Sequence, residues 1–293
     1  MKKRIETKES RTAEATCLAR AMSFYEKNNS LKSEDYIAPI ILPPFFKTLL
    51  KSNILRTIFK KCFFHYGIYE YVITRTKYID EIFKNLKSDF DQILIFGAGF
   101  DSRAIRFYNN LKNTTVYELD SPTTQTAKIN QFKKINIEFP PNLKFVSIDF
   151  EKESLNQKLE ACSFQKNKTC LFLLEGLTMY LDPSAIDNTF LLIKEYAGKD
   201  SLIIFDYVFS SVLRGESNNY GAKGITKSVE RQGEKWVFGI EKGQIDHFLN
   251  KYEFELIDES DSLKLAKKFF QEKEENIIPE INAAHCIITA RKK

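Results

Sequence analysis

Two glycines that follow an apolar stretch could let the chain approach a nucleotide-like cofactor closely. The segment is ILIFGAGFDSRAIRF, residues 93–107, in which Gly97, Ala98 and Gly99 lie between a predicted strand and the start of a helix. Glycine permits the tight turn, and no Cβ intrudes on a bound group. The pattern predicts a cofactor site at the first crossover of an α/β sheet.

The residues after this turn indicate which cofactor it holds. A dinucleotide-binding turn has a third glycine where this chain has Ser102, and Asp101 precedes that position. A carboxylate here would repel a diphosphate, whereas it suits a cofactor with a sulfonium and an amino group. The turn therefore favours S-adenosyl-L-methionine. The alternatives are an NAD(P)-dependent Rossmann oxidoreductase and a non-catalytic cofactor-binding protein.

Acidic residues end three further predicted strands. Asp120 follows the glycines by about 20 positions, the spacing at which a carboxylate accepts hydrogen bonds from ribose hydroxyls. Asp149 could accept the adenine amino group while Phe150 covers the ring, although Asp is also a common helix N-cap. Glu175 closes the fourth strand. These strand ends are where open α/β sheets bind ligands.

The apolar pattern predicts the elements that carry these residues. Five near-continuous apolar runs, residues 92–96, 115–119, 144–148, 169–174 and 201–207, are typical of a parallel sheet covered on both faces. We predict an α/β fold with a Rossmann-like, doubly wound, mostly parallel seven-stranded sheet, an antiparallel C-terminal strand and an added N-terminal helical lid.

The chain is predicted to form a single domain with four parts. These are an N-terminal helical cap or lid (1–88), the cofactor-binding core (89–207), a lid insertion (208–240) and a C-terminal helix with strands (241–293). Within them we expect a proline-rich connector at 35–44, an irregular glycine-containing stretch at 208–236, a helix at 242–250 and a final strand at 282–290.

Composition argues against several other classes of protein. The formal charge of +5 comes from dispersed lysines, so no nucleic-acid partner is expected. Five cysteines without a CxxC pair predict neither a disulfide framework nor a zinc site, and no metal is expected. No apolar run approaches the roughly 18 residues of a membrane span, and no signal peptide is recognised. A cytoplasmic protein without a membrane partner is therefore expected.

Six segments in this order resemble one known family. They are SRTAEATCLARAMS (10–23), TRTKYID (74–80), ILIFGAGFDSRAIRF (93–107), VYELDSP (116–122), SIDF (147–150) and EGLTMYL (175–181). Together they resemble the leucine carboxyl methyltransferase-like family of class I S-adenosylmethionine-dependent methyltransferases, in its bacterial O-methyltransferase branch. The resemblance weakens after about residue 185 and continues in WVFGIEKGQIDHFL (236–249).

The resemblance implies roles for individual residues. Arg75 would pair with the cofactor carboxylate and Arg20 would support it, while Gly97 would lie under the methionine portion. Asp120 would bind the ribose, Asp149 and Phe150 the adenine, and Glu175 the cofactor from the fourth strand. The product would be S-adenosyl-L-homocysteine. A bidentate arginine for a buried carboxylate also has independent physical support.

The methyl acceptor determines whether the reaction needs a base. A carboxylate on a small molecule is already ionised, whereas a hydroxyl must lose a proton. Candidate bases are His247, His285 and Asp206, of which the histidines are also compatible with core positions. Tyr180 and Tyr207 are further weak catalytic candidates because they follow the fourth strand and end the fifth.

Overall fold

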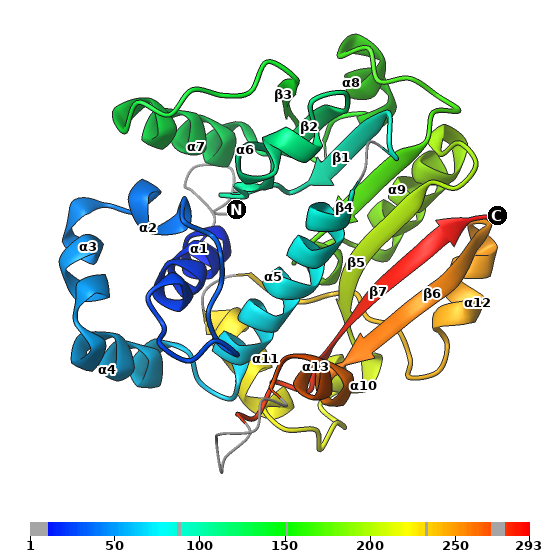
Figure 1. The fold of residues 1–293 in the computed structure, drawn as a ribbon. Helices are drawn as coiled ribbons and strands as arrows, with labels where there is room; N and C mark the ends of the chain where they lie inside the picture. Colours follow the sequence, from blue (N-terminus) through cyan, green and yellow to red (C-terminus); the bar gives the residue numbers. More distant parts are fainter. Residues whose placement is uncertain (1–10, 87–88, 151, 232–233, 271–278) are drawn as a thin grey trace.

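In the part of the chain that the structure describes, a single twisted sheet of seven strands organises the fold (Figure 1). The computed structural model describes residues 11–86, 89–150, 152–231, 234–270 and 279–293. The strand order across the sheet is β3-β2-β1-β4-β5-β7-β6. The strands are β1 (Gln92–Phe96), β2 (Thr115–Asp120), β3 (Leu143–Ser147), β4 (Cys170–Leu174), β5 (Leu202–Val208), β6 (Phe254–Asp261) and β7 (His285–Lys292).

The first five strands are parallel, and β7 runs antiparallel between β5 and β6. The chain order reverses between β1 and β4, because β2 and β3 lie to one side of β1 and the later strands to the other. That reversal is the point at which doubly wound sheets bind ligands beyond their carboxyl ends. The predicted fold class is confirmed.

Helices cover both faces of this sheet. Among residues 11–86, the helices before the first strand are α1 (Arg11–Phe24), α2 (Ala38–Ile41), α3 (Pro44–Lys51), α4 (Asn53–Phe63) and α5 (Ile68–Asn85). The others are α6 (Arg103–Arg106), α7 (Pro122–Lys134), α8 (Leu155–Ala161), α9 (Pro183–Tyr196), α10 (Ser210–Leu213), α11 (Ala222–Arg231), α12 (Ile245–Lys251) and α13 (Ser262–Phe269), with short 3₁₀ turns η2 (Tyr108–Asn110) and η3 (Thr178–Tyr180). Among the described residues, no helix is both long and apolar enough to traverse a membrane.

The two faces of the sheet pack into two separate cores. Ile93 and Ile95 of β1 join the side chains of α1, α2, α5 and α13. Leu94 and Phe96, which alternate with them, join those of α8, α9 and α12. Because successive side chains of a strand point to opposite faces, a continuous apolar strand is buried on both sides. The result is a three-layer arrangement with the sheet in the middle (Figure 1).

Two local predictions are corrected by the structure. The expected connector at 35–44 contains α2. Pro39 lies in its first turn, where the N–H group that proline lacks would have no partner within the helix, so proline is tolerated there. The expected irregular stretch at 208–236 contains α10 and α11. Gly215 (φ 73°) and Gly221 (φ 77°) lie between these two helices and do not interrupt either. Residues 232 and 233 of that stretch lie outside the described residues.

Two element boundaries also differ from the prediction. The helix expected at 242–250 begins at Ile245, because Gly243 adopts a left-handed conformation before it. The last strand begins at His285, not at Asn282. The backbone N–H groups of Asn282 and Ala283 donate to Gly67 and Tyr220 and so do not join the sheet. Ser10, the first residue of the first family-like segment, lies outside the described residues.

Candidate cofactor site

The glycine turn lies beyond the end of β1, between α1 and the segment after β4. Gly97 (φ 59°) and Gly99 (φ 51°) both have left-handed backbones. A Cβ on Gly97 would lie 3.1 Å from Cδ1 of Leu177, and one on Gly99 would lie 3.1 Å from the Cβ of Ala13. The N–H of Ala98 donates to the Leu119 carbonyl at 3.0 Å. Any side chain here would be strained and crowded, so the turn requires glycine.

Asp120 ends β2 directly beside this turn. Its carboxylate accepts the N–H of Gly99 at 2.5 Å and the N–H of Ser121 at 2.6 Å. Burial raises the pKa of Asp120, and these two N–H groups oppose that shift. Each carboxylate oxygen still has a second lone pair, which could accept a hydroxyl of a bound ribose.

Arg75 on α5 joins the ends of β4 and β5. Its Nε donates to Oε1 of Glu175 at 2.9 Å, and its Nη1 donates to Oδ2 of Asp206 at 2.6 Å. Asp206 is fixed from two other sides by the Tyr71 hydroxyl at 2.9 Å and the Gly176 N–H at 2.6 Å. Burial lowers the pKa of Arg75, but the carboxylates of Asp206 and Glu175 outweigh it and the net shift is upward.

Arg103, four residues after Gly99, connects three acidic side chains. Its Nε donates to Asp80 at 2.8 Å, and its Nη1 donates to Glu175 at 2.7 Å and to Asp101. Burial alone would raise the pKa of Glu175, but the nearby arginines, Arg103 first, lower it to about 2. Glu175 is therefore ionised at neutral pH.

Two more arginines extend the network toward α1 and the loop after it. Arg106 pairs with Asp80 at 2.7 Å and lies 3.4 Å from Asp35. Arg20 of α1 donates to the Phe100 carbonyl at 2.7 Å and lies 3.2 Å from Asp35. We call the whole set the arginine–carboxylate cluster. It consists of Arg20, Arg75, Arg103 and Arg106 with Asp35, Asp80, Asp101, Glu175 and Asp206.

The cluster has the charge and the spare donors that S-adenosylmethionine requires. Four arginines face five carboxylates, which leaves a formal charge of −1. A ligand with one sulfonium, one ammonium and one carboxylate carries +1 and complements it. The described bonds of Arg75 use Nε and Nη1, which leaves Nη2 for a cofactor carboxylate. The residues present therefore fit this cofactor.

Most of the predicted cofactor residues converge on this edge of the sheet. Arg20, Arg75 and Glu175 belong to the cluster, while Gly97, Ala98, Gly99 and Asp120 form the adjoining turn. Asp149 and Phe150 lie beyond β3 and are half-buried. The Phe150 ring is 6.3 Å from the ring of Phe96, the last residue of β1, so this segment borders the turn. The Asp149 carboxylate pairs with Lys152 at 3.2 Å.

The catalytic candidates separate into two groups. Asp206 belongs to the cluster, and Tyr180 is surrounded by Thr12, Trp236 and Glu234, with its pKa raised by burial. Tyr207 points to the other face of β5, where its hydroxyl donates to Glu259 of β6 at 3.2 Å. The structure thus leaves Tyr207 outside the site. His247 is exposed on α12 and also lies apart from it.

His285, the first residue of β7, forms an aromatic group beside the cluster. Its ring stacks on Tyr71 at 4.2 Å and meets Trp236 edge-on at 5.2 Å. Burial, assisted by the charge of Arg75, lowers the pKa of His285 to about 3, so the ring is neutral at physiological pH. Sequence reasoning missed this grouping, because Tyr71 and Trp236 carry no local pattern that links them to residue 285.

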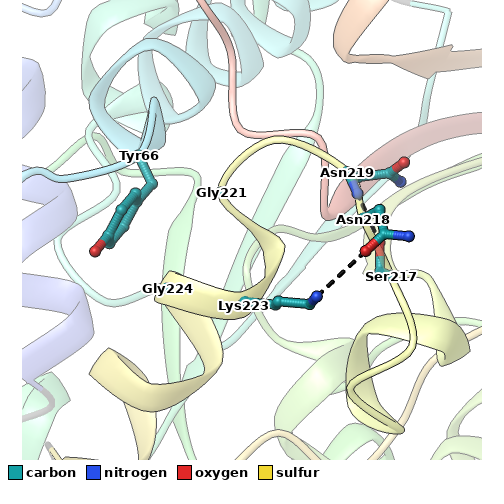
Figure 2. Close-up of a pocket in the computed structure, with 7 residues that line it drawn as sticks. All are labelled: Tyr66, Ser217, Asn218, Asn219, Gly221, Lys223 and Gly224. Carbon is teal, nitrogen blue, oxygen red and sulfur yellow. Dashed lines mark hydrogen bonds between the residues drawn. The ribbon is translucent and has the colours of Figure 1, made fainter.

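A hollow separate from the glycine turn lies at the start of α11 (Figure 2). It has a volume of about 210 Å³ and is lined by Tyr66, Ser217, Asn218, Asn219, Gly221, Lys223 and Gly224. Lys223 donates to the Asn218 side chain at 3.2 Å across it. None of these residues belongs to the arginine–carboxylate cluster, so the hollow is a separate feature.

The fold and the edge of the sheet define a Rossmann-like methyltransferase, and comparison with known proteins agrees. The model of the family "Leucine carboxyl methyltransferase" matches residues 13–194. In solved structures, a "putative methyltransferase" from Thermobifida fusca YX superposes with a TM-score of 0.58 at 15% identity, covering 94% of each chain. That similarity concerns the fold alone.

Curated relatives give the same class. "Putative S-adenosyl-L-methionine-dependent methyltransferase YktD" of Bacillus subtilis is 26% identical over 70% of this chain and 67% of its own length. A relative of the same description from Mycobacteroides abscessus is 30% identical over 48% of this chain, and the match spans 46% of that protein, about half its length.

The chain belongs to the leucine carboxyl methyltransferase family, since the family model covers more than half of it. The predictions of family, of an S-adenosylmethionine-dependent methyltransferase and of its cofactor are confirmed at this level. An NAD(P)-dependent oxidoreductase is no longer a competing interpretation.

Proposed function

We propose that this protein transfers the methyl group of S-adenosylmethionine to an oxygen atom, a hydroxyl or a carboxylate, of a small molecule. The observation that carries the proposal is the arginine–carboxylate cluster at the carboxyl edge of the sheet, beside the glycine turn and Asp120. When bound, the cofactor supplies an activated methyl group on a positively charged sulfur. The protein must then align the acceptor with that group and exclude water.

Asp206 acts in this proposal as a positioning residue and not as a base. Its Oδ2 already accepts the Tyr71 hydroxyl and Arg75, and its Oδ1 accepts the Gly176 N–H. These three donors fix the carboxylate in place. It keeps Arg75 against Gly176, where a Cβ would lie 3.2 Å from Nη1.

The tautomer of His285 supports a hydroxyl as the acceptor. The Asn282 side chain donates through Nδ2 to the Tyr66 carbonyl, and its Oδ1 accepts the Ala284 N–H. His285 Nδ1, at 3.1 Å from that Oδ1, must therefore carry the proton, which leaves Nε2 with a lone pair. A neutral ring with a free lone pair can accept a hydrogen bond from a hydroxyl and orient it.

The charge balance of the cluster supports the same acceptor. Each of its arginines is already paired with a carboxylate. Because the cofactor with its charge of +1 neutralises the cluster, no spare cation remains there to attract a carboxylate acceptor, whereas a hydroxyl needs none. The aromatic rings of Tyr71, Trp236 and Tyr180 add flat apolar surface near His285.

Calorimetric titration with S-adenosylhomocysteine tests the cofactor assignment. We expect binding by the wild type and a loss of about tenfold or more in Asp120→Ala, because two bonds to a bound ribose correspond to at least 1.4 kcal/mol. Glu118→Gln, which changes a buried acid two residues earlier that pairs with Lys128, is the matched control. Equal affinity for the wild type and Asp120→Ala would contradict the assignment.

Methyl transfer to a panel of small molecules tests the acceptor. With radiolabelled cofactor, we expect base-stable methyl ethers on hydroxyl-bearing aromatic compounds. Base-labile methyl esters would identify a carboxylate acceptor instead. Incorporation into amines alone would contradict O-methylation while leaving cofactor binding unchanged.

A further inference from the structure

The segment between Asp35 and Glu70 has an unusual charge pattern. Residues 36–69 contain no Asp or Glu, but they contain four lysines and one arginine together with many Phe, Ile and Leu residues. In the structure this segment forms α2, α3 and α4. Figure 1 shows them at the outer side of the N-terminal layer, which consists of the helices α1 to α5 before β1, away from the sheet. A basic, apolar and acid-free surface element is therefore present.

Helix α4 buries an arginine and exposes apolar side chains, unlike an ordinary surface helix. Arg56 is its buried residue, and the guanidinium donates to the Leu50 carbonyl at 2.5 Å and the Tyr25 carbonyl at 3.0 Å. Ile54 and Ile58, one turn apart, have 72% and 54% of their surface exposed. A helix on a water-facing surface normally buries its apolar side.

The exposed apolar side chains continue from α3 to α4. Phe45 and Phe63 are 67% and 65% exposed. The rings of Phe45 and Phe46 lie 4.3 Å apart, Phe46 meets Phe59 at 6.3 Å, and Phe59 stacks on Phe63 at 4.0 Å. We call the exposed apolar residues of α3 and α4 the outer apolar face. It consists of Phe45, Ile54, Leu55, Ile58 and Phe63.

Exposed lysines lie next to this face. Lys61 is exposed and follows Ile58 by three residues, so both lie on the same side of α4. Lys51 is exposed at the end of α3, two residues before α4 begins. Contiguous exposed apolar surface marks an interaction site. A partner that binds here must also carry negative charge, because it meets the lysines beside the outer apolar face.

We propose that the outer apolar face docks on an anionic lipid surface. Apolar side chains enter the boundary between headgroups and acyl chains, while Lys51 and Lys61 contact the negatively charged headgroups. This is the mode of an interfacial amphipathic helix, which lies in the plane of the membrane without crossing it. The absence of acidic residues in 36–69 removes the repulsion that such a surface would otherwise exert. The proposal is independent of the methyl acceptor.

Flotation of the full chain with lipid vesicles tests the proposal. We expect binding to vesicles of equal parts phosphatidylcholine and phosphatidylglycerol, weak binding to phosphatidylcholine alone, and release at high salt. Ile54→Glu/Ile58→Glu and Lys51→Glu/Lys61→Glu should each reduce binding by about tenfold or more. All four side chains are exposed, so neither double variant disturbs the core.

Ile257→Glu/Leu263→Glu is the matched control, because it introduces two charges at exposed apolar positions on β6 and α13. It should bind vesicles as the wild type does, and all variants should bind S-adenosylhomocysteine equally. Equal binding to both kinds of vesicle, or no binding at low salt, would overturn the proposal. So would a wild-type dimer in sedimentation that Ile54→Glu/Ile58→Glu dissociates, since the face would then join two copies of the chain.

Discussion

Two buried arginines on neighbouring helices of the N-terminal layer are compensated in different ways. Arg75 on α5 is held by the carboxylates of Asp206 and Glu175. Arg56 on α4 is held by the backbone carbonyls of Leu50 and Tyr25 and by the amide oxygen of Asn53. The first arrangement gathers charge at one point, and the second satisfies a single charge with neutral dipoles.

The difference separates the part of the layer that forms the site from the part that faces outward. In the proposed cofactor site, carboxylates around Arg75 would preorganise a charged edge for a charged ligand, at the energetic cost of burying several ions. Carbonyls around Arg56 fix this arginine on the inner side of α4, while Ile54 and Ile58 stay at the surface. Experiments that remove each arginine should therefore have different consequences.

Arg75→Ala should have the largest effect. It leaves the buried carboxylates of Asp206 and Glu175 without a cation, and breaking such a pair costs about 3–5 kcal/mol of unfolding free energy. Urea unfolding measures this loss, and titration with S-adenosylhomocysteine should show no saturable binding. Lys84→Ala, which breaks an exposed pair with Glu34 at the end of the same helix, should cost less than about 1 kcal/mol. Similar losses in both variants would contradict a larger contribution to stability from the buried pairs of Arg75 than from an exposed pair.

Arg56→Met should have the next largest effect and should act on stability alone. The substitution leaves two backbone carbonyls without a charged donor, for which we expect a loss of about 3 kcal/mol in urea unfolding. The affinity for S-adenosylhomocysteine should stay within twofold of the wild type. A large loss of affinity would mean that α4 contributes to the cofactor site.

Lowering the pH should destabilise the protein through His285. Unfolded, this histidine binds a proton below about pH 6.5, whereas in the folded protein its pKa is about 3, so unfolding takes up a proton between these values. Stability attributable to His285 is therefore full above pH 6.5 and decreases as the pH falls. Between pH 7 and pH 5 the wild type should lose about 2 kcal/mol more than His285→Gln. Parallel losses would contradict a buried neutral ring.

Two tyrosines, Tyr71 on α5 and Tyr207 on β5, should have the smallest effects on stability and different effects on cofactor affinity. Tyr71→Phe and Tyr207→Phe each remove one hydroxyl that donates to a carboxylate, so each should cost about 1–2 kcal/mol of stability. Tyr71 helps to hold Asp206, and its loss should weaken S-adenosylhomocysteine binding several-fold. Tyr207 reaches Glu259 on the other side of the sheet, and its loss should leave that binding unchanged. Equal effects of the two substitutions on affinity would contradict the placement of Tyr71 beside the cofactor site and of Tyr207 on the other face of the sheet.

The strands and their acidic ends could be predicted from the sequence, because both depend on local patterns. A buried parallel strand is continuously apolar, and the residues that follow it must reach the same edge of the sheet. Gly97, Gly99, Asp120 and Glu175 follow such strands, and the structure places all of them at the edge where the sheet order reverses.

The partners of the buried charges could not be predicted in this way. Asp80 and Arg103 lie within the family-like segments, but a single sequence does not indicate that they face each other. The same limit applies to Arg56, since an arginine on a helix normally points to water. Tyr207 is a candidate because it ends the predicted strand 201–207, yet the alternation of side chains along a strand places it on the opposite face from Asp206.

The position of β7 has a consequence for how the protein is made. This strand lies between β5 and β6, so β6 joins the sheet only through residues 285–292. During synthesis, the parallel strands can assemble early, but β5 keeps an open edge until those residues leave the ribosome. The aromatic group around His285 is therefore completed late in folding, well after the glycine turn.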